Sequence, residues 1–301
     1  MKYTIKDIAQ MAGVSKATVS RVLNNSKPVS PEIRQRVLKV IEETKFQPSS
    51  VARSLTTRET RLIGVIIPDV ANLVFSKIIQ GIEAEAHERD YTILLCNSRY
   101  NEDQEIKYLD ILKDKEVDGV IFHSFHSSER VSKKLQEIGK PTVLIGINAE
   151  FAPYPVIMID NEKAAFEATE HLIKCGHTKI GMIHGPSDDP YAGLLRLKGY
   201  KEALKAYNLE FDEDRIIEGH YKLKDGYNGI KALMDTNPDM TAVFCANDEM
   251  AIGAIKGATD SGRSVPEDIS VIGFDDIDIA EIYTPSLTTI AQPFEAKGIS
   301  A

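Results

Sequence analysis

The stretch VSKATVSRVLN, from Val14 to Asn24, places cationic and small side chains at helical spacing near the N-terminus. Lysine and arginine donate hydrogen bonds to O6 and N7 of guanine, and a small alanine can contact the methyl group of thymine. Lys16, Ala17 and Arg21 therefore have the chemistry to read base edges. Nearby groups suited to hydrogen-bonding phosphate oxygens are Thr4, Ser15, Ser20 and Asn24. The alternative is the solvated face of an ordinary amphipathic helix.

These side chains need short helices to position them, and the sequence predicts two around a turn. Thr4 can cap a first helix over IKDIAQM, with Ile5, Ile8, Ala9 and Ala12 on one face, and Gly13 ends it. In the second helix, the residues expected to pack inward are Ala17, Val19, Val22 and Leu23. This pattern predicts a helix-turn-helix unit, whose second helix enters the major groove.

A third helix is indicated by Ser30 as N-cap and Pro31 at the first helical position, followed by IRQRVLKVIEET. The residues expected to complete the small core are Ile33, Val37, Leu38 and Ile41. A three-helix module that binds another protein is the alternative to DNA binding. Both interpretations require the same helices.

The distribution of charge favours a polyanionic partner for this segment. Residues 1–61 contain 12 lysine or arginine and 5 aspartate or glutamate residues, whereas the remaining chain holds 24 and 40 of them, for a net charge of −9 overall. Basic side chains that neutralise phosphates release counterions, while an acidic body discourages non-specific binding. A solvated basic arm is the alternative interpretation of this bias.

The next stretch, QPSSVARSLTTRETRLIG, begins with a break at Pro48 and places Val51, Ala52 and Leu55 on one helical face. This segment is too short to form a stable helix alone, so we expect it to become ordered only when it is docked. TIKDIAQMAGVSKATVSRVLNNSKPVS followed by PSSVARSLTTRETRLIGVIIPD resembles the LacI/GalR family of bacterial transcriptional regulators.

The resemblance implies a homodimer that binds double-stranded operator DNA. It assigns the segment containing Val51, Ala52 and Leu55 to the minor groove at the centre of a pseudo-palindromic operator. Leu55 is then the apolar wedge that opens a base step, together with its counterpart from the second subunit. The resemblance also implies a repressor controlled by a sugar or related metabolite.

The rest of the chain alternates apolar runs with amphipathic segments, a pattern typical of an α/β fold with buried parallel strands. The expected strands are LIGVII, TILLC, DGVIFH, TVLIG, KIGMIHG, AVFCAND and SVIGFDD. The expected helices are FSKIIQGIEAEAHE, EDQEIKYLDILKD, EKAAFEATEHLIKC, AGLLRLKGYKEALKAY and DEMAIGAIKGATD. Two such series match the two-lobed, periplasmic-binding-protein-like body that the resemblance implies.

The expected domain organisation has an all-α helix-turn-helix head over residues 1–48 and a hinge helix and linker over 49–61. The effector-binding and dimerisation domain covers residues 62–301, with a ligand cleft outside the carboxyl ends of its strands. We expect a first lobe over about 62–160 plus 292–301 and a second over about 161–291. The family continues beyond the final TTIAQPFEAKGISA, so the C-terminus looks truncated.

The resemblance also implies an effector site. Val74 and Phe75 match positions that pack against the ligand, Arg196 matches an arginine that donates to hydroxyls or a carboxylate, and Tyr221 matches a stacking aromatic residue. The matching positions that accept from sugar hydroxyls are Asn247, Asp248 and Asp275. For each position a structural role is the alternative: Phe75 can belong to the core, and Asp275 can cap the next segment.

One position departs from the pattern of sugar-responsive members. Many of them carry an Asp-Arg pair after the fourth strand of the first lobe, where this chain has Gly146, Ile147 and then Asn148. The departure weakens the case for a ribose-like ligand and resembles the catabolite control branch. That branch uses a phosphorylated carrier protein as corepressor, which is the alternative partner, whereas Arg196 favours a small-molecule cleft.

Other classes of function find little support in the sequence. GPSDDPYAG lacks the Gly-Lys-Ser/Thr ending of a phosphate-binding loop. His171, Cys175 and His177 have zinc-like spacing without an evident fourth ligand, and His123 and His126 are expected in loops unless they line the cleft. We expect no enzyme activity, no metal and no cofactor.

The expected location is the cytoplasm, with no membrane partner. The N-terminus lacks a secretory signal, and no apolar run reaches membrane-spanning length. The three cysteines, Cys96, Cys175 and Cys245, are odd in number and far apart, which suits a reducing compartment.

Overall fold

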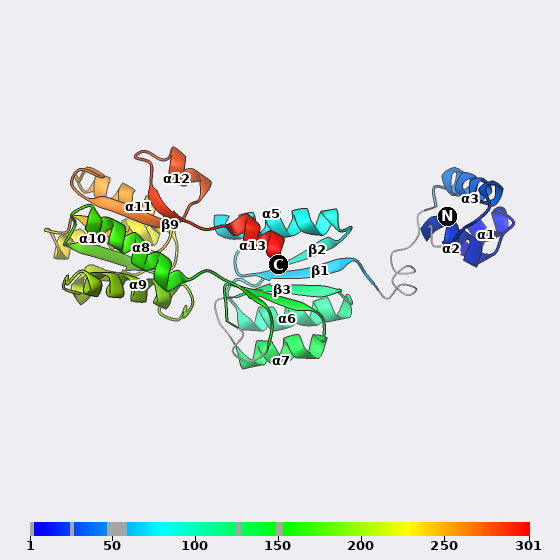
Figure 1. Cartoon of the computed structure of the whole chain (residues 1–301), viewed down its shortest axis with the longest axis horizontal. Helices are drawn as coiled ribbons and strands as arrows, with labels where there is room; N and C mark the ends of the chain where they lie inside the picture. The colour runs from blue at the N-terminus through cyan, green and yellow to red at the C-terminus, as the bar shows by residue number, and fades with distance from the viewer. Residues whose placement is uncertain (1–2, 25–26, 47–58, 125–127, 149–152) are drawn as a thin grey trace. The chain divides into compact units, whose positions relative to one another are not determined.

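The computed structural model describes residues 3–24, 27–46, 59–124, 128–148 and 153–301. The chain divides into two units, residues 1–60 and residues 61–301. Within the larger unit, two separate sheets form two lobes (Figure 1). The predicted hinge residues Val51, Ala52 and Leu55 lie outside the described residues, as does His126.

The first unit is a three-helix head, as predicted. Its helices are α1 (Ile5–Met11), α2 (Lys16–Asn24) and α3 (Pro31–Thr44). Thr4 caps α1 in a reciprocal arrangement, because Asp7 N donates to Thr4 Oγ1 and Thr4 N donates to Asp7 Oδ2 at 2.8 Å. Gly13 has a φ of +64°, which turns the chain between α1 and α2.

The core of the head differs from the prediction at two positions. The buried side chains are Ile8, Ala9, Ala12, Val19, Val22, Val37 and Val40. Ala17 is exposed on α2, and Leu38 is 46% exposed on α3, so neither packs inward. The apolar face of α3 is formed by Val37 and Val40, with Ile33 and Ile41 partly buried beside them.

The first lobe is a parallel five-stranded sheet in the order β2-β1-β3-β4-β5. Its strands are β1 (Leu62–Ile67), β2 (Thr92–Asn97), β3 (Gly119–His123), β4 (Thr142–Ile145) and β5 (Val156–Ile157). In Figure 1, α5 and α13 cover one face of this sheet, and α6 and α7 cover the other. These helices are α5 (Leu73–Glu88), α6 (Glu102–Asp114), α7 (Glu129–Ile138) and α13 (Phe294–Ser300).

The second lobe repeats this plan with a parallel sheet in the order β10-β9-β8-β6-β7. Its strands are β6 (Ile180–His184), β7 (Ile216–Glu218), β8 (Ala242–Cys245), β9 (Ser270–Asp275) and β10 (Thr288–Ala291). Its helices are α8 (Asn161–Lys174), α9 (Gly193–Ala206), α10 (Leu223–Thr236), α11 (Asp248–Asp260) and α12 (Asp278–Ile282), with a 3-10 turn at Glu213–Arg215.

The predicted fold class is confirmed, and the strands and helices expected in the head and in the two lobes form close to their expected positions, whereas the expected hinge helix lies outside the described residues. The sequence did not predict β5, β7, β10, α7, α10 or α12. β5 and β7 span two and three residues, too few to show periodicity. None of the described helices is long and apolar enough to cross a bilayer.

The last helix returns from the second lobe and packs closely against α5 of the first. A Cβ atom added at Gly81 would lie 2.2 Å from Glu295 O, and one added at Gly298 would lie 2.2 Å from Ile78 O. Phe294, at the start of α13, is 3% exposed and joins the apolar cluster of the first lobe. Only glycines allow the two helix backbones to approach this closely.

Candidate functional site

The head exposes the side chains that were predicted to read DNA. Lys16, Ala17 and Arg21 are exposed on α2, and Ser20 is half-buried. Ser15 Oγ accepts a hydrogen bond from Thr18 N at 3.1 Å, so Ser15 caps the start of α2. The prediction that Ala17 packs inward is wrong, and its methyl group is instead available for contact from outside. The side chain of Asn24 lies outside the described residues.

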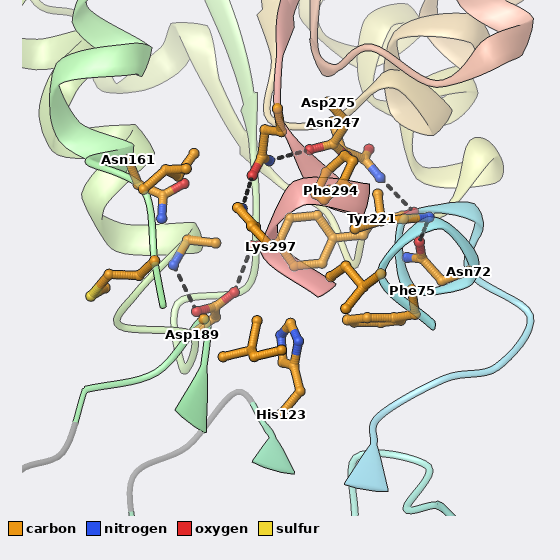
Figure 2. A pocket seen from close by; sticks show the side chains of 18 of the residues that line it. Asn72, Phe75, His123, Asn161, Asp189, Tyr221, Asn247, Asp275, Phe294 and Lys297 are labelled. Atoms are coloured by element: carbon orange, nitrogen blue, oxygen red, sulfur yellow. Dashed lines mark hydrogen bonds between the residues drawn. The ribbon is translucent and has the colours of Figure 1, made fainter. Parts of the chain in front are cut away.

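The second candidate site is a cavity of about 90 Å³ at the carboxyl ends of the strands, lined by residues of both lobes (Figure 2). Of the seven predicted effector residues, the six that line it are Val74, Phe75, Arg196, Tyr221, Asn247 and Asp275. The seventh, Asp248, lies outside the lining. Asp248 is fully buried, and it accepts hydrogen bonds from Ile277 N at 2.9 Å and Thr289 Oγ1 at 2.5 Å.

Arg196, on α9, is held by the protein itself. Its Nε donates to Asn161 Oδ1 at 2.9 Å, and its Nη1 donates to Ala246 O at 2.5 Å. The guanidinium carbon lies 3.7 Å from the centre of the Phe274 ring, a cation–π contact. Nη1 also lies 3.8 Å from Asp275 Oδ1. These contacts fix the position of the Arg196 guanidinium, which therefore holds a positive charge beside Asp275.

Asp275 begins a chain of polar contacts that crosses from one lobe to the other. Gln292 Nε2 donates to Asp275 Oδ1 at 2.6 Å, and Lys297 Nζ donates to Gln292 Oε1 at 2.6 Å (Figure 2). Burial raises the pKa of Asp275 to about 7, while the neighbouring Arg196 opposes this increase. Burial, together with the charge of Arg196, lowers the pKa of Lys297 to about 8. The cavity thus contains an acid and a base whose charges change near neutral pH.

Tyr221 and Asn247 are oriented by contacts within the second lobe. Tyr221 Oη donates to Asp189 Oδ2 at 2.7 Å, and burial raises the pKa of Tyr221 well above its usual value. Asn247 Oδ1 accepts from Met250 N at 2.9 Å, and Asn247 Nδ2 donates to Tyr221 O at 3.1 Å. Asn247 therefore caps α11 and holds Tyr221. This is a structural role of the kind given above as the alternative to ligand binding.

On the first lobe, His123 ends β3 and faces the cavity beside Phe75. The two rings make an edge contact with centroids 4.8 Å apart. Burial lowers the pKa of His123 to about 3, with a smaller contribution from Lys297, and its Nδ1 has no hydrogen-bond partner among the described residues. Gly146 lies behind the imidazole, since a Cβ atom there would be 2.8 Å from His123 Nε2. His123 is thus a cavity residue and not a loop residue.

Comparison with known proteins identifies the architecture that carries both sites. Residues 4–49 match the family model described as bacterial regulatory proteins, lacI family. Residues 60–301 match the model described as periplasmic binding proteins and sugar binding domain of LacI family. The chain belongs to the LacI family. The resemblance predicted from the sequence is therefore confirmed.

Curated relatives of this LacI-family chain are similar over nearly its whole length. Catabolite control protein A of Priestia megaterium is 39% identical over 97% of this chain and 88% of that protein. The HTH-type transcriptional repressor PurR of Vibrio atlanticus is 36% identical over 99% of this chain and 89% of that protein. The LacI-family chain is accordingly a DNA-binding transcriptional regulator with an effector-binding domain, from a family that is not enzymatic.

Two similar solved structures contain bound ligands. The lac repressor dimer bound to operator and the anti-inducer ONPF is 28% identical, covers 100% of this chain and 90% of its own, and has a TM-score of 0.91. The complex of the transcriptional regulator CelR with cellobiose is 33% identical, covers 99% of this chain and 90% of its own, and has a TM-score of 0.73.

Several cavity residues of this LacI-family chain were not predicted. Those with polar side chains are Asn72, Asn161, Asp189, Gln292 and Lys297, whereas a place in the cleft was the stated alternative for His123. Asp189 follows β6, so the rule that ligands bind after the carboxyl ends of strands could have found it. Gln292 and Lys297 follow β10 and enter the cavity because the chain crosses back to the first lobe. The family resemblance implied this crossing, but local periodicity does not show which of its side chains face the cavity.

The region that showed zinc-like spacing is occupied by ordinary contacts. His177 Nδ1 lies 2.9 Å from Thr241 Oγ1, and Cys175 Sγ lies 3.8 Å from His171 Nε2 one helical turn away. Over the described part of the chain, no group of three or more histidine, cysteine or acidic side chains is placed to hold a metal ion.

Proposed function

We propose that this chain is a homodimeric repressor that binds a pseudo-palindromic operator and is controlled by a sugar-like molecule in the cavity between the lobes. The observation that carries the proposal is the cavity itself, because residues of both lobes line one space that contains aromatic, amide and charged groups. Similar solved structures support it, since one holds a lac repressor dimer on operator and another holds the regulator CelR with cellobiose. The cytoplasmic location stays a prediction from the sequence.

A ligand that contacts both lobes favours one arrangement of the lobes over others. We infer that this arrangement changes the order of the hinge segment containing Leu55 and thereby changes operator affinity. Such coupling is reciprocal, so an effector that weakens operator binding must itself bind less tightly to the operator complex, by the same factor.

The test is effector affinity measured by calorimetry with and without a saturating operator duplex. We expect a difference of at least about fivefold, the lower end of typical allosteric coupling. Equal affinities in the two states would contradict the mechanism. Leu55→Ala should weaken operator binding, reduce DNA bending and leave effector affinity unchanged. Unchanged DNA bending would contradict the role of Leu55 as a wedge.

A second candidate is corepression by a phosphorylated carrier protein. It is favoured by the similarity to catabolite control protein A and by Gly146, which replaces the expected acidic residue of an Asp-Arg pair. A thermal-shift screen of sugars, sugar derivatives and a phosphocarrier protein separates the candidates. A shift with small molecules alone supports the cavity, whereas a shift only with the carrier protein supports the second candidate.

A further inference from the structure

Lys297 differs from the other charged groups of the cavity in how its charge is compensated. Its Nζ donates to the neutral Gln292 amide at 2.6 Å and lies 5.0 Å from the centre of the Phe294 ring. Among the described residues, no carboxylate oxygen lies within 4.0 Å of this ammonium group. A partly buried cation whose direct contacts are all neutral is poorly compensated.

The two acids of the cavity, in contrast, already have protein partners. Asp189 accepts from Tyr221 Oη at 2.7 Å and from the backbone N–H groups of Ala192 at 2.9 Å and Tyr191 at 3.1 Å. Asp275 accepts from Gln292 and lies beside Arg196. The groups that lack matched partners are therefore donors on the first-lobe side, namely the Lys297 ammonium and the His123 imidazole with its unpartnered Nδ1.

We propose that the ligand of this cavity carries a carboxylate that accepts a hydrogen bond from Lys297, so that Lys297 selects sugar acids over neutral sugars. This inference rests on the proposed function, because it names the chemical class of the effector in the same cavity. Lys297 supplies the charge-assisted hydrogen bond, which is about twice as strong as one between neutral groups.

The charges of the cavity favour a carboxylate over a phosphate. A phosphate monoester carries close to two negative charges at neutral pH, whereas a carboxylate carries one. Asp189 and Asp275 line the same small space, so a second negative charge on the ligand would be repelled at short range. Lys297 alone can compensate one negative charge, and Arg196 is already engaged by Asn161, Ala246 and Asp275.

Binding of an anion next to Lys297 also predicts uptake of a proton. The charged groups around Lys297 are Arg196 from α9 and Asp275 from β9, and the neutral His123 faces it from β3. A carboxylate raises the pKa of Lys297 above its value of about 8 in the unliganded protein. Affinity for a sugar acid then falls as the pH rises through about 7 and 8, because Asp275 becomes negatively charged and Lys297 loses its proton. Affinity for a neutral sugar should change much less.

The experiment compares matched ligands on matched variants of the full chain. Calorimetry measures binding of glucose, glucuronate and glucose 6-phosphate, and of galactose, galacturonate and galactose 6-phosphate. The proteins are the wild type, Lys297→Met, Lys297→Arg and the control Lys224→Met, which removes an exposed lysine on α10. Circular dichroism and operator binding verify that each variant is folded.

We expect at least one acid to bind the wild type about tenfold or more tightly than its neutral partner, as one charge-assisted hydrogen bond provides. Lys297→Met should remove this preference without weakening neutral binding, Lys297→Arg should keep most of it, and Lys224→Met should keep all of it. For the wild type near pH 8, the binding enthalpy should be measured in two buffers with different ionisation enthalpies. It should differ between the buffers for the sugar acid, which shows proton uptake, and should not differ for the neutral sugar.

Three results would overturn the inference: a neutral sugar that binds as tightly as its acid, a sugar phosphate that binds more tightly than the acid, or a preference that survives Lys297→Met. In each of these cases the sugar-like effector of the proposed function still stands. If no panel member binds any of the folded, operator-binding proteins, the sugar-like effector and this inference both fail.

Discussion

Arg196 shows how one side chain can serve both packing and recognition. Its contacts with Asn161, Ala246 and the ring of Phe274 fix the guanidinium, and Asp275 depends on it for charge compensation. The family resemblance assigns a ligand-binding role to Arg196, while the structure shows a role in organising the cavity. Both roles place it at the centre of any response to a ligand.

For Arg196→Ala we therefore expect loss of effector response, with operator binding retained because the head is a separate unit. The change leaves Asp275 buried without its cation, so the free energy of unfolding should also fall, by about 3 kcal/mol or more. Calorimetry, a gel-shift assay and urea denaturation measure the three quantities. Arg130→Ala, at an exposed arginine paired with Asp103, serves as the control and should change none of them.

His123 provides a test through pH. Burial, with the nearby Lys297, lowers the pKa of His123 to about 3 in the folded protein, whereas an unfolded histidine titrates near its usual value of 6.5. Between these values the unfolded chain binds the proton and the folded chain does not. The contribution of His123 to stability is therefore full above pH 6.5 and is lost as the pH falls towards 3.

We expect the free energy of unfolding of His123→Gln to fall less steeply than that of the wild type between roughly pH 6 and pH 4. The difference in slope should reach up to about 1.4 kcal/mol per pH unit. Urea denaturation at several pH values measures it, and comparing the two proteins cancels the other titrating groups. His87→Gln, at an exposed histidine of α5, should keep the wild-type slope, and parallel curves for His123→Gln would contradict the assignment.

Helix α2 brings its exposed side chains together only because its neighbours hold the opposite face. Val19 and Val22 are buried against α1 and α3, which leaves Lys16, Ala17 and Arg21 facing outward. An isolated helix of nine residues would be marginal in water, so the packing of the head provides the stability of α2.

Arg21→Ala should weaken operator binding by about 1–3 kcal/mol and relax the base preference at one position of each half-site. Binding to random DNA should weaken far less. Competition binding with a library of operator variants measures both effects. Lys39→Ala, at an exposed lysine of α3 that pairs with Glu43, is the matched control. An equal loss of operator affinity with Lys39→Ala would show that Arg21 contributes only non-specific electrostatic attraction to DNA.

The contact between α5 and α13 is equally specific, because two glycines allow it. Gly298→Ala would place a methyl group against Ile78 O, where the backbone cannot move without separating the helices. We expect the free energy of unfolding to fall by about 1–3 kcal/mol, as overpacking typically causes. Ala296→Ser, on the exposed side of α13, should have little effect in the same denaturation experiment.

The elements were largely predictable from the sequence, because buried parallel strands such as LIGVII appear as apolar runs between amphipathic helices. Individual side chains were less predictable. Leu38 is exposed because Val37 and Val40 already fill the narrow core of the head, and helical periodicity alone allowed either solution. Asp248 is held inside its lobe by Thr289, a partner far away in sequence. Lys297 reaches the cavity through a crossover that local patterns do not encode.

Across the larger unit, two ion pairs connect the lobes near the cavity. Lys222 Nζ lies 3.0 Å from Asp69 Oδ2, and Lys77 Nζ lies 2.6 Å from Asp278 Oδ1. Each pair joins a residue of the first lobe to one of the second, so each favours the arrangement in which the lobes are close together. Because all four side chains are partly exposed, each pair contributes at most about 1 kcal/mol.

Lys222→Ala should therefore lower effector affinity by at most about fivefold, since a smaller fraction of the free protein has its lobes together. The loss should shrink at high salt, which screens the exposed pair. Lys224→Ala, two residues further along the chain, is the matched control. An affinity of Lys222→Ala equal to that of the wild type at low salt would show that the pair does not bias the lobes.

The return of α13 to the first lobe has a consequence for how the chain is made. Phe294 completes the apolar cluster that contains Phe75 and Ile78, yet it is synthesised after the entire second lobe. Until then, the side of α5 that carries Gly81 faces water on the ribosome. The first lobe emerges before the second but is therefore completed after it. Both the cavity and the apolar cluster that contains Phe294 can form only after the second lobe has been synthesised.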